Sequence, residues 1–185
     1  MINVYENFLE SYDELKEHAL KADYPGVESP ADGVTYPYIC VDVPESVKTE
    51  VKERLDKILG REAKINYLFL RKSPEGVKAP QIAHHDLCMG AFTFILYLND
   101  REDAGTALLR HRETGMCYAP ESDTFVNVAR GDQNNPEKWA IRHLVKMKEN
   151  RAIAFDSGQF HCALPINGFG TETSDSRIAL ICSFS

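Results

Sequence analysis

Two histidines and an aspartate occupy consecutive positions, His84, His85 and Asp86, shortly before an apolar run. Imidazole and carboxylate groups are ligands that first-row divalent metals accept. In an extended segment neighbouring side chains alternate, so His84 and Asp86 share one face while His85 points to the other. The triplet therefore predicts two ligands of a metal site, and a one-residue shift of register would replace His84 with His85.

A stable site needs a third protein ligand, and His161 is the best candidate. It follows a β-type run and lies between Gly158 and Pro165, in the stretch "FDSGQFHCALPINGFG". The other histidines lie in a predicted helix or in charged contexts: His18, His111 and His143. Two histidines and one carboxylate leave half of the metal open, which is typical of non-haem Fe(II) oxygenases.

Arg177 opens an otherwise uncharged final strand, sixteen positions after His161. A guanidinium that points into a β-barrel is costly unless a carboxylate meets it, and arginine can hold a carboxylate through two parallel hydrogen bonds. The alternative interpretation is a surface arginine at the first position of a strand. The sequence alone leaves both interpretations open.

Composition indicates a single soluble domain over residues 1–185. Acidic residues outnumber basic ones by 28 to 21, which disfavours nucleic acid and anionic membranes as partners and leaves a small molecule or peptide. The five cysteines show no CxxC spacing, so we expect no disulfide framework. No signal peptide or membrane span is predicted, and we expect a cytoplasmic protein.

The periodicity predicts a mainly β fold with flanking N-terminal helices. Residues 1–60 carry helical spacing over 12–22 and again from 42–45 to a stop at Gly60. Residues 61–185 read as short β-type runs separated by turn residues, which indicates a sandwich or barrel. Within this body, residues 135–150 are predicted to form a short helix or a long structured loop, beginning near Pro136.

The order of motifs "HHD", "TFILYLND", "AGTALL", "NRAIAFDSGQFH" and "RIAL" resembles the 2-oxoglutarate and Fe(II)-dependent oxygenase superfamily, particularly its prolyl 4-hydroxylase-like branch. The resemblance covers about residues 66–184 and implies a double-stranded β-helix, or jelly roll. It implies that His84, Asp86 and His161 are the catalytic iron ligands. It further implies that Arg177, and in some relatives Tyr97, binds the distal carboxylate of 2-oxoglutarate.

The implied activity is hydroxylation of an unactivated C–H bond in a small molecule, amino acid or peptide. Fe(II) is the metal, 2-oxoglutarate and O2 are co-substrates, and succinate and CO2 are released. Two features depart from the family pattern. The spacing from His161 to Arg177 exceeds the family's usual ten or so residues, and Ala104-Gly105 stands where paired glycines are expected.

Two other functions use the same residues. A cupin-like hydrolase or isomerase would use the ligands to hold zinc or manganese as a Lewis acid. A non-catalytic module would keep the β-helix and bind metal without turnover. An ordinary β-sandwich with solvated histidines is the third alternative, and it predicts no metal binding.

Substrate choice is expected to lie in loops around the metal. The candidates are residues 74–83, the insertion from Arg112 to Asn150, and the loop after Pro165. Trp139, within the insertion, is predicted to be a core anchor rather than a lid residue. Cys88 and Cys162 lie next to presumed ligands, and both are predicted to be packing residues.

Overall fold

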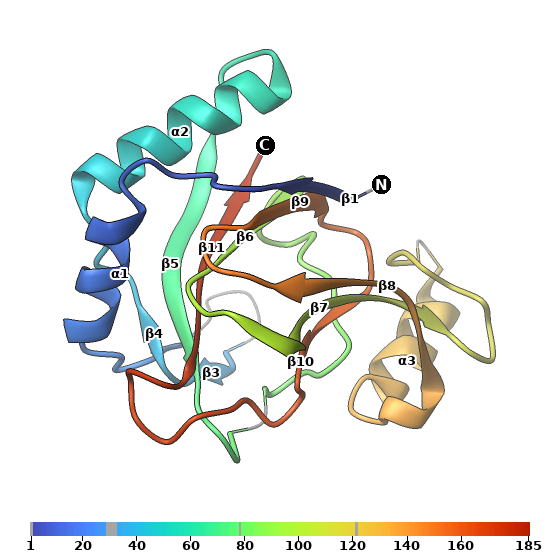
Figure 1. Ribbon diagram of the computed structural model, residues 1–185. Helices are drawn as coiled ribbons and strands as arrows, with labels where there is room; N and C mark the ends of the chain where they lie inside the picture. Colours follow the sequence, from blue (N-terminus) through green and yellow to red (C-terminus); the bar gives the residue numbers. More distant parts are fainter. Residues whose placement is uncertain (1, 29–32, 78, 121) are drawn as a thin grey trace.

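The computed structural model describes residues 2–28, 33–77, 79–120 and 122–185. Two antiparallel sheets face each other in the body of the molecule (Figure 1). The large sheet has the order β1-β9-β6-β11-β5-β4 and the small sheet the order β10-β7-β8. The large-sheet strands are β1 (Ile2–Tyr5), β4 (Ile39–Cys40), β5 (Ile65–Ser73), β6 (Phe92–Tyr97), β9 (Ala152–Asp156) and β11 (Arg177–Phe184). The small-sheet strands are β7 (Arg101–His111), β8 (Trp139–Met147) and β10 (His161–Leu164), and β2 (Val27–Glu28) pairs separately with β3 (Thr35–Tyr36).

Both predicted N-terminal helices are confirmed. Helix α1 spans Tyr12–Lys21 and α2 spans Glu45–Leu59, after which Gly60 ends the helix in the left-handed conformation. They lie along one side of the large sheet (Figure 1). The apolar stripe of α2 packs on the outward-facing side chains of the central strands, among them Leu70 and Leu180. The helices therefore cover the outer face of the large sheet and leave its inner face to the small sheet.

Alternation along the strands gives the inner face a different set of side chains. In β11, Ala179 pairs with Arg71 of β5 on one side and with Tyr97 of β6 on the other. Because directly paired residues share a face of the sheet, these three side chains point the same way. Tyr97 and Ala179 belong to the cluster that packs against Leu108 of the small sheet. This face is therefore the interior of the double sheet, and Arg71 points into it.

Residues 135–150 do not form the predicted helix or loop. Pro136 begins a single 3-10 turn, Pro136–Lys138, and the chain then continues as β8 at the edge of the small sheet. Trp139, Val145 and Met147 are buried, whereas the positions from Ile141 to Leu144 are exposed. An edge strand that packs on one face carries polar residues on the other. The run of exposed positions hid the two-residue alternation by which a strand is recognised in a sequence.

A helix that the sequence analysis did not predict lies ahead of β8. Helix α3 spans Asp123–Asp132 and packs beside the far end of the small sheet (Figure 1). Its sequence, "DTFVNVARGD", is short and contains Gly131, a poor helix former near the helix end. The helix forms because its C-terminal end is fixed by tertiary hydrogen bonds, described below.

The loop after Pro165 closes one end of the interior. The Phe169 N–H donates to the Ser73 carbonyl (3.1 Å), and the Arg177 N–H donates to the Phe169 carbonyl (3.3 Å). Gly168 makes this approach possible, since its φ is +66° and a Cβ atom there would lie 2.3 Å from the Pro74 carbonyl oxygen. Only glycine fits both the backbone conformation and the space.

We expect Gly168→Ala to destabilise the protein by about 3 kcal/mol or more, because alanine adds a backbone clash to an unfavourable φ. Gly76→Ala is the matched control, since Gly76 also has a positive φ (+82°) but nothing lies within 4 Å of a Cβ there. This control should cost only about 1 kcal/mol. Urea denaturation measures both values, and equal losses would contradict the close packing of the loop.

Candidate metal centre

Three of the predicted site residues come together. Among the described residues, the ligand atoms of His84, Asp86 and His161 all lie within 4.8 Å of one another. His161 Nε2 is 3.4 Å from Asp86 Oδ2, and His84 Nε2 is 3.9 Å from Asp86 Oδ1. His85 is exposed, and its ring packs edge-on to Phe160 instead. Of the two adjacent histidines, the structure therefore brings His84 into the cluster.

Backbone pairing explains how distant residues meet. The His84 N–H donates to the His161 carbonyl (3.1 Å) and the His161 N–H donates to the His84 carbonyl (2.9 Å), which forms an isolated antiparallel bridge. Two residues further on, the Asp86 N–H donates to the Ser157 carbonyl (2.8 Å). The segment with the first two ligands is thus attached to the start of β10, where the third ligand lies.

The two imidazoles are oriented by backbone carbonyls. His84 Nδ1 donates to the Ile82 carbonyl (3.1 Å) and His161 Nδ1 donates to the Gln159 carbonyl (3.0 Å). A ring nitrogen that donates to a carbonyl carries the proton, so the opposite nitrogen keeps its lone pair when the ring is neutral. Both Nε2 atoms face Asp86 and are available as ligands. This arrangement suits a divalent first-row metal, whose histidine ligands usually have such outer hydrogen bonds.

The electrostatics favour an ionised carboxylate beside the two rings. Burial raises the pKa of Asp86, but the charge and hydrogen bond of His161, with His84 and Thr93, outweigh burial and lower it overall. Burial lowers the pKa of His84 to about 4, assisted by His161 and opposed by Asp86. For His161, Asp86 outweighs burial and raises the pKa. Near neutral pH the site therefore offers an anionic ligand and a neutral His84.

Thr93 is a supporting residue that the sequence analysis missed. Its hydroxyl lies 3.1 Å from Asp86 Oδ2 and 2.8 Å from Ser157 Oγ. Thr93 and Ser157 therefore lie beside the cluster of candidate ligands, His84, Asp86 and His161, which we call the metal cluster. The sequence contained a signal, because Thr93 is a polar residue at an inward position of the apolar strand "FTFILY". The contact holds the carboxylate in one orientation.

The insertion supports the same ligand segment from the other side. Asn134 donates its side-chain N–H to the Pro80 carbonyl (3.1 Å) and accepts the Ile82 N–H (2.9 Å). The Ala83 N–H donates to the Gln133 carbonyl (2.9 Å). These hydrogen bonds join the end of α3 to the residues immediately before His84. Lys78 and Glu121, which fall within the segments predicted to set specificity, lie outside the described residues.

A buried polar contact fixes α3 in turn. Asp132 Oδ2 lies 2.9 Å from Nε2 of His111, which is fully buried, and the Asp132 carbonyl accepts the Trp139 indole N–H (2.9 Å). Trp139 packs against Phe160 with ring centroids 4.8 Å apart. The prediction that Trp139 is a core anchor is therefore confirmed.

Arg177 is buried, which rules out the surface interpretation. Its residue is 3% exposed, and its Nε atom has no hydrogen-bond partner among the described residues. Burial lowers the pKa of Arg177 to about 10, although Tyr97 opposes the shift. A buried guanidinium without a carboxylate partner is costly. An anionic ligand would remove that cost.

Tyr97 lies in the same interior region. It is fully buried, its hydroxyl donates to Thr106 Oγ1 (2.8 Å), and burial raises its pKa to about 12. Thr106 pairs with Ala163, whereas Leu108 pairs with His161. Because two residues along a strand span about 7 Å, Thr106 lies about that far along β7 from Leu108, the residue opposite His161. This separation is close to the length of a five-carbon dicarboxylate.

An open cleft lies beside the metal ligand His84, which forms part of its lining. Ala163 and Arg71 of β5 also line this cleft. The sequence analysis missed Arg71. Its signal was a charge among aromatic residues at alternate positions of a strand, since Tyr67, Phe69 and Arg71 lie on the same face of β5.

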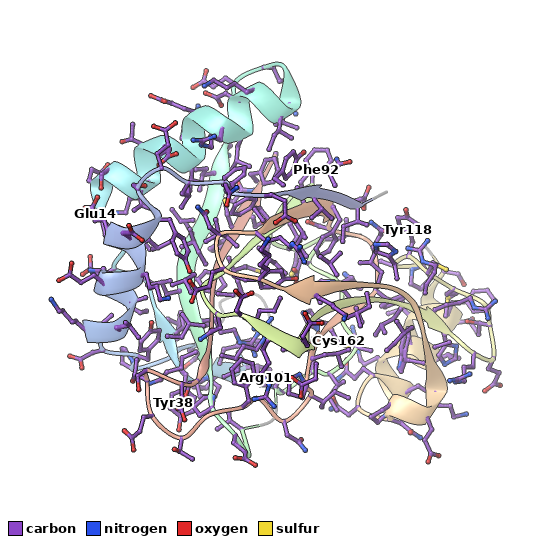
Figure 2. The ribbon with its side chains drawn as sticks, viewed as in Figure 1. Glu14, Tyr38, Phe92, Arg101, Tyr118 and Cys162 are labelled. Carbon is purple, nitrogen blue, oxygen red and sulfur yellow. The ribbon has the colours of Figure 1, made fainter. Side chains whose placement is uncertain are left out.

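The two cysteines beside the ligands differ. Cys162 is buried among the apolar residues of β7 and β10, as predicted, and Figure 2 shows it within the body of the molecule. Cys88 is exposed, so the prediction that it is a packing residue is wrong. Beyond Asp86 the chain turns instead of continuing as a strand, and the turn carries Cys88 to the surface.

Solved structures share this arrangement of sheets. HygX from Streptomyces hygroscopicus, solved with nickel, 2-oxoglutarate and hygromycin B, is 10% identical, with 98% of this chain and 82% of HygX matched at a TM-score of 0.59. The α-ketoglutarate-dependent epimerase SnoN of nogalamycin biosynthesis is 12% identical over 98% of this chain and 78% of SnoN, with a TM-score of 0.57. A Pseudomonas putida prolyl-4-hydroxylase is 14% identical over 99% and 91%, with a TM-score of 0.51.

These likenesses confirm the predicted double-stranded β-helix, the fold of the 2-oxoglutarate and Fe(II) oxygenases. By sequence, the chain belongs to the family described as "Family of unknown function (DUF6445)", whose model matches residues 1–175. A search of curated proteins gave no match. In the described part of the chain, every helix is too short or too polar to cross a membrane.

We expect His84→Ala, Asp86→Ala and His161→Ala each to weaken Co(II) binding by about 100-fold or more, because each removes a ligand. Anaerobic titration, followed by the visible absorption of Co(II), measures the affinity. His85→Ala is the matched control and should bind Co(II) like the wild type, since the neighbouring ring lies outside the cluster. Equal losses in the control and in His84→Ala would contradict the assignment of His84.

Proposed function

We propose that this protein is a 2-oxoglutarate- and Fe(II)-dependent oxygenase that oxidises an unactivated C–H bond of a small substrate. In this proposal His84, Asp86 and His161 hold the iron, and Arg177 with Tyr97 binds the distal carboxylate of 2-oxoglutarate. The observation that carries it is the combination of an inward-facing His-Asp-His cluster with the buried Arg177, whose Nε atom has no hydrogen-bond partner among the described residues. The shared fold supports the proposal.

The chain's own residues have defined tasks. The carbonyls of Ile82 and Gln159 hold the two imidazoles so that their Nε2 atoms face the metal position. The Thr93 hydroxyl orients the Asp86 carboxylate, and His161, with His84 and Thr93, lowers the pKa of Asp86. Bound iron and 2-oxoglutarate would supply the oxidising chemistry, with O2 as the oxidant and succinate and CO2 as by-products.

Burial of the residues proposed to bind 2-oxoglutarate strengthens that binding and keeps water away from the metal. Tyr97 and Thr106 place two hydroxyl groups next to the Arg177 region, and both residues are fully buried. In such a low-dielectric site, hydrogen bonds from a guanidinium to a carboxylate are strong. The same burial excludes water from the neighbourhood of the metal. The loop around Gly168 contributes by closing this end of the interior.

Two finer points stay within the proposal. Hydroxylation is the proposed outcome, although SnoN, which shares the fold, is an epimerase. The assay below therefore measures succinate, because succinate reports turnover of 2-oxoglutarate whatever the substrate is converted to. Membership of the prolyl 4-hydroxylase-like branch also stays a prediction, since the Pseudomonas putida prolyl-4-hydroxylase has a TM-score of 0.51 compared with 0.59 for HygX.

The alternatives give different results in the same experiments. A cupin-like hydrolase or isomerase would turn over without O2 and would not require 2-oxoglutarate. A binding module would hold metal and produce no succinate. The buried Arg177 favours the oxygenase, since its guanidinium forms no ion pair among the described residues and neither alternative requires a buried cation near the metal ligands.

We expect Arg177→Gln to weaken 2-oxoglutarate binding by about 100-fold, because the substitution removes a charged, two-point contact to a buried carboxylate. Anaerobic titration of the Fe(II) protein with 2-oxoglutarate, followed by the visible charge-transfer band of the chelate, measures this affinity. Arg177→Lys should lose less, since the positive charge remains. Circular dichroism checks that each variant is folded.

Turnover gives the second readout. With Fe(II), 2-oxoglutarate, ascorbate and O2, the wild type should release succinate, and Asp86→Ala and His161→Ala should release none above background. His85→Ala should match the wild type. Succinate release that persists in the two ligand variants would end the proposal.

A further inference from the structure

The open cleft beside the metal cluster is positively charged in an otherwise acidic protein. The chain has a formal net charge of −7, yet the charged residues among the described cleft lining are Arg71 and Lys72, with no aspartate or glutamate. A cleft lined by one sign of charge concentrates ligands of the opposite sign. The cleft therefore favours an anion.

Lys72 already has partners outside the interior. Its ammonium donates to Thr173 Oγ1 (2.8 Å) and lies 4.8 Å from the centre of the Tyr24 ring. Lys72 lies on β5 and pairs with Ile178 of β11, which packs on the helix side of the large sheet. The Lys72 side chain thus points away from the metal cluster. Arg71, on the opposite face of β5, is the cation that faces inward.

Arg71 is held in place, and no carboxylate of the described residues forms an ion pair with it. Burial lowers the pKa of its guanidinium, and the charges of Tyr36 and Asp86 partly offset that shift. Its guanidinium carbon lies 5.9 Å from the centre of the Tyr36 ring, a cation–π contact that limits its orientation. Within the described residues, no hydrogen bond or ion pair of the Arg71 guanidinium is found. It lines the cleft together with His84, which is one of the three candidate metal ligands. A partly buried, oriented guanidinium beside a metal ligand is suited to binding a carboxylate.

The two interior arginines do not occupy equivalent positions. Arg177 pairs with Ser73, at the closed end under the Phe169 loop, and is not part of the cleft lining. Arg71 pairs with Ala179, one inward position away, and lines the cleft beside Gln81 and Ile82, which precede His84 in the chain. Arg177 is therefore enclosed at that end of the interior, whereas Arg71 lines the open cleft beside His84.

A count of formal charges shows that the proposed co-substrate does not neutralise both arginines. Fe(II) carries two positive charges and Asp86 offsets one of them. 2-Oxoglutarate carries two negative charges, and Arg177 together with the remaining charge of the metal site balances them. The charge of Arg71 is left over, and a partly buried charge is stable when an opposite charge meets it.

We propose that Arg71 binds a carboxylate of the substrate, so that this protein oxidises a small carboxylic acid held at the mouth of the metal site. The inference rests on the proposed function and adds the chemical class of the substrate. A carboxylate on Arg71 would fix one end of the substrate beside His84, while the rest of the molecule lies towards the metal. The adjacent apolar lining, Ile82 and Ile166, suits a hydrocarbon portion.

The first arm of the test separates the substrate carboxylate from the carboxylates of 2-oxoglutarate. Affinity for 2-oxoglutarate is measured by anaerobic titration of the Co(II) protein as wild type, Arg71→Gln and Arg177→Gln. We expect Arg71→Gln to stay within about threefold of the wild type, whereas Arg177→Gln loses about 100-fold. A loss in Arg71→Gln equal to that in Arg177→Gln would assign Arg71 to the co-substrate and overturn the proposal.

The second arm tests carboxylate recognition with named probes. Butanoate, hexanoate, benzoate and the N-acetyl derivatives of the L-amino acids, each paired with its primary amide, are added to the protein saturated with 2-oxoglutarate. Ligand NMR compares probe relaxation in the Co(II) and Zn(II) forms without O2, because paramagnetic Co(II) accelerates relaxation only of probes bound near the metal. We expect at least one carboxylate to bind about tenfold more tightly than its amide.

Three variants complete this arm. Arg71→Gln should abolish the preference for the carboxylate, and Arg71→Lys should retain part of it. Lys72→Gln is the matched control, since it removes one positive charge at the neighbouring position of β5. It should keep most of the preference, because the Lys72 ammonium points away from the metal site. Circular dichroism verifies that all three variants are folded.

The remaining outcomes are also decisive. Equal binding of carboxylates and amides, unchanged preference in Arg71→Gln, or no carboxylate bound by the wild type would each refute the inference while leaving the proposed function intact. A wild type that binds no 2-oxoglutarate in the first arm contradicts the proposed function itself, and this inference with it.

Discussion

The candidate site depends on one pair of backbone hydrogen bonds, those that join His84 to His161. The first residue lies in an irregular segment and the second begins a strand of the small sheet, so no local preference brings them together. Once they are paired, the alternation of side chains directs both rings and Asp86 towards one point. The neighbouring carbonyls of Ile82 and Gln159 then select which ring nitrogens face inward.

A second constraint shapes the interior, namely that its two arginines form no ion pair with a carboxylate among the described residues. Most of the inner surface is apolar, with Leu108, Ile153 and Phe155 among its members. Arg71 and Arg177 enter this surface from neighbouring strands. Burial lowers the pKa of each guanidinium. A protein that keeps two such charges inside favours anionic ligands, which is the physical basis of both proposals made above.

The sequence predicted the N-terminal helices, most of the strands and the first two candidate ligands because those features follow local rules. The spacing of Val47, Val51 and Leu55 indicated a helix, and the His-x-Asp pattern placed two ligands on one face. Residues 139–147 were misassigned, since an edge strand with exposed positions from Ile141 to Leu144 lacks a clean period of two. Thr93 and Arg71 were missed, because their importance comes from strands that approach only in three dimensions. The choice between His84 and His85 likewise required the bridge to His161.

The amide of Asn134 contacts the chain on both sides of Gln81, and through it the insertion carrying α3 is fastened to the residues that precede His84. Helix α3 lies at the periphery, beside β8 in Figure 1. A displacement of this helix would therefore be transmitted to the segment that carries His84 and Asp86. Lengthening or shortening this insertion would alter the tension on the ligand-bearing segment as well as the shape of the surface. The Asn134 amide and the hydrogen bond from the Ala83 N–H to the Gln133 carbonyl thus join the insertion to the residues that hold His84 in place.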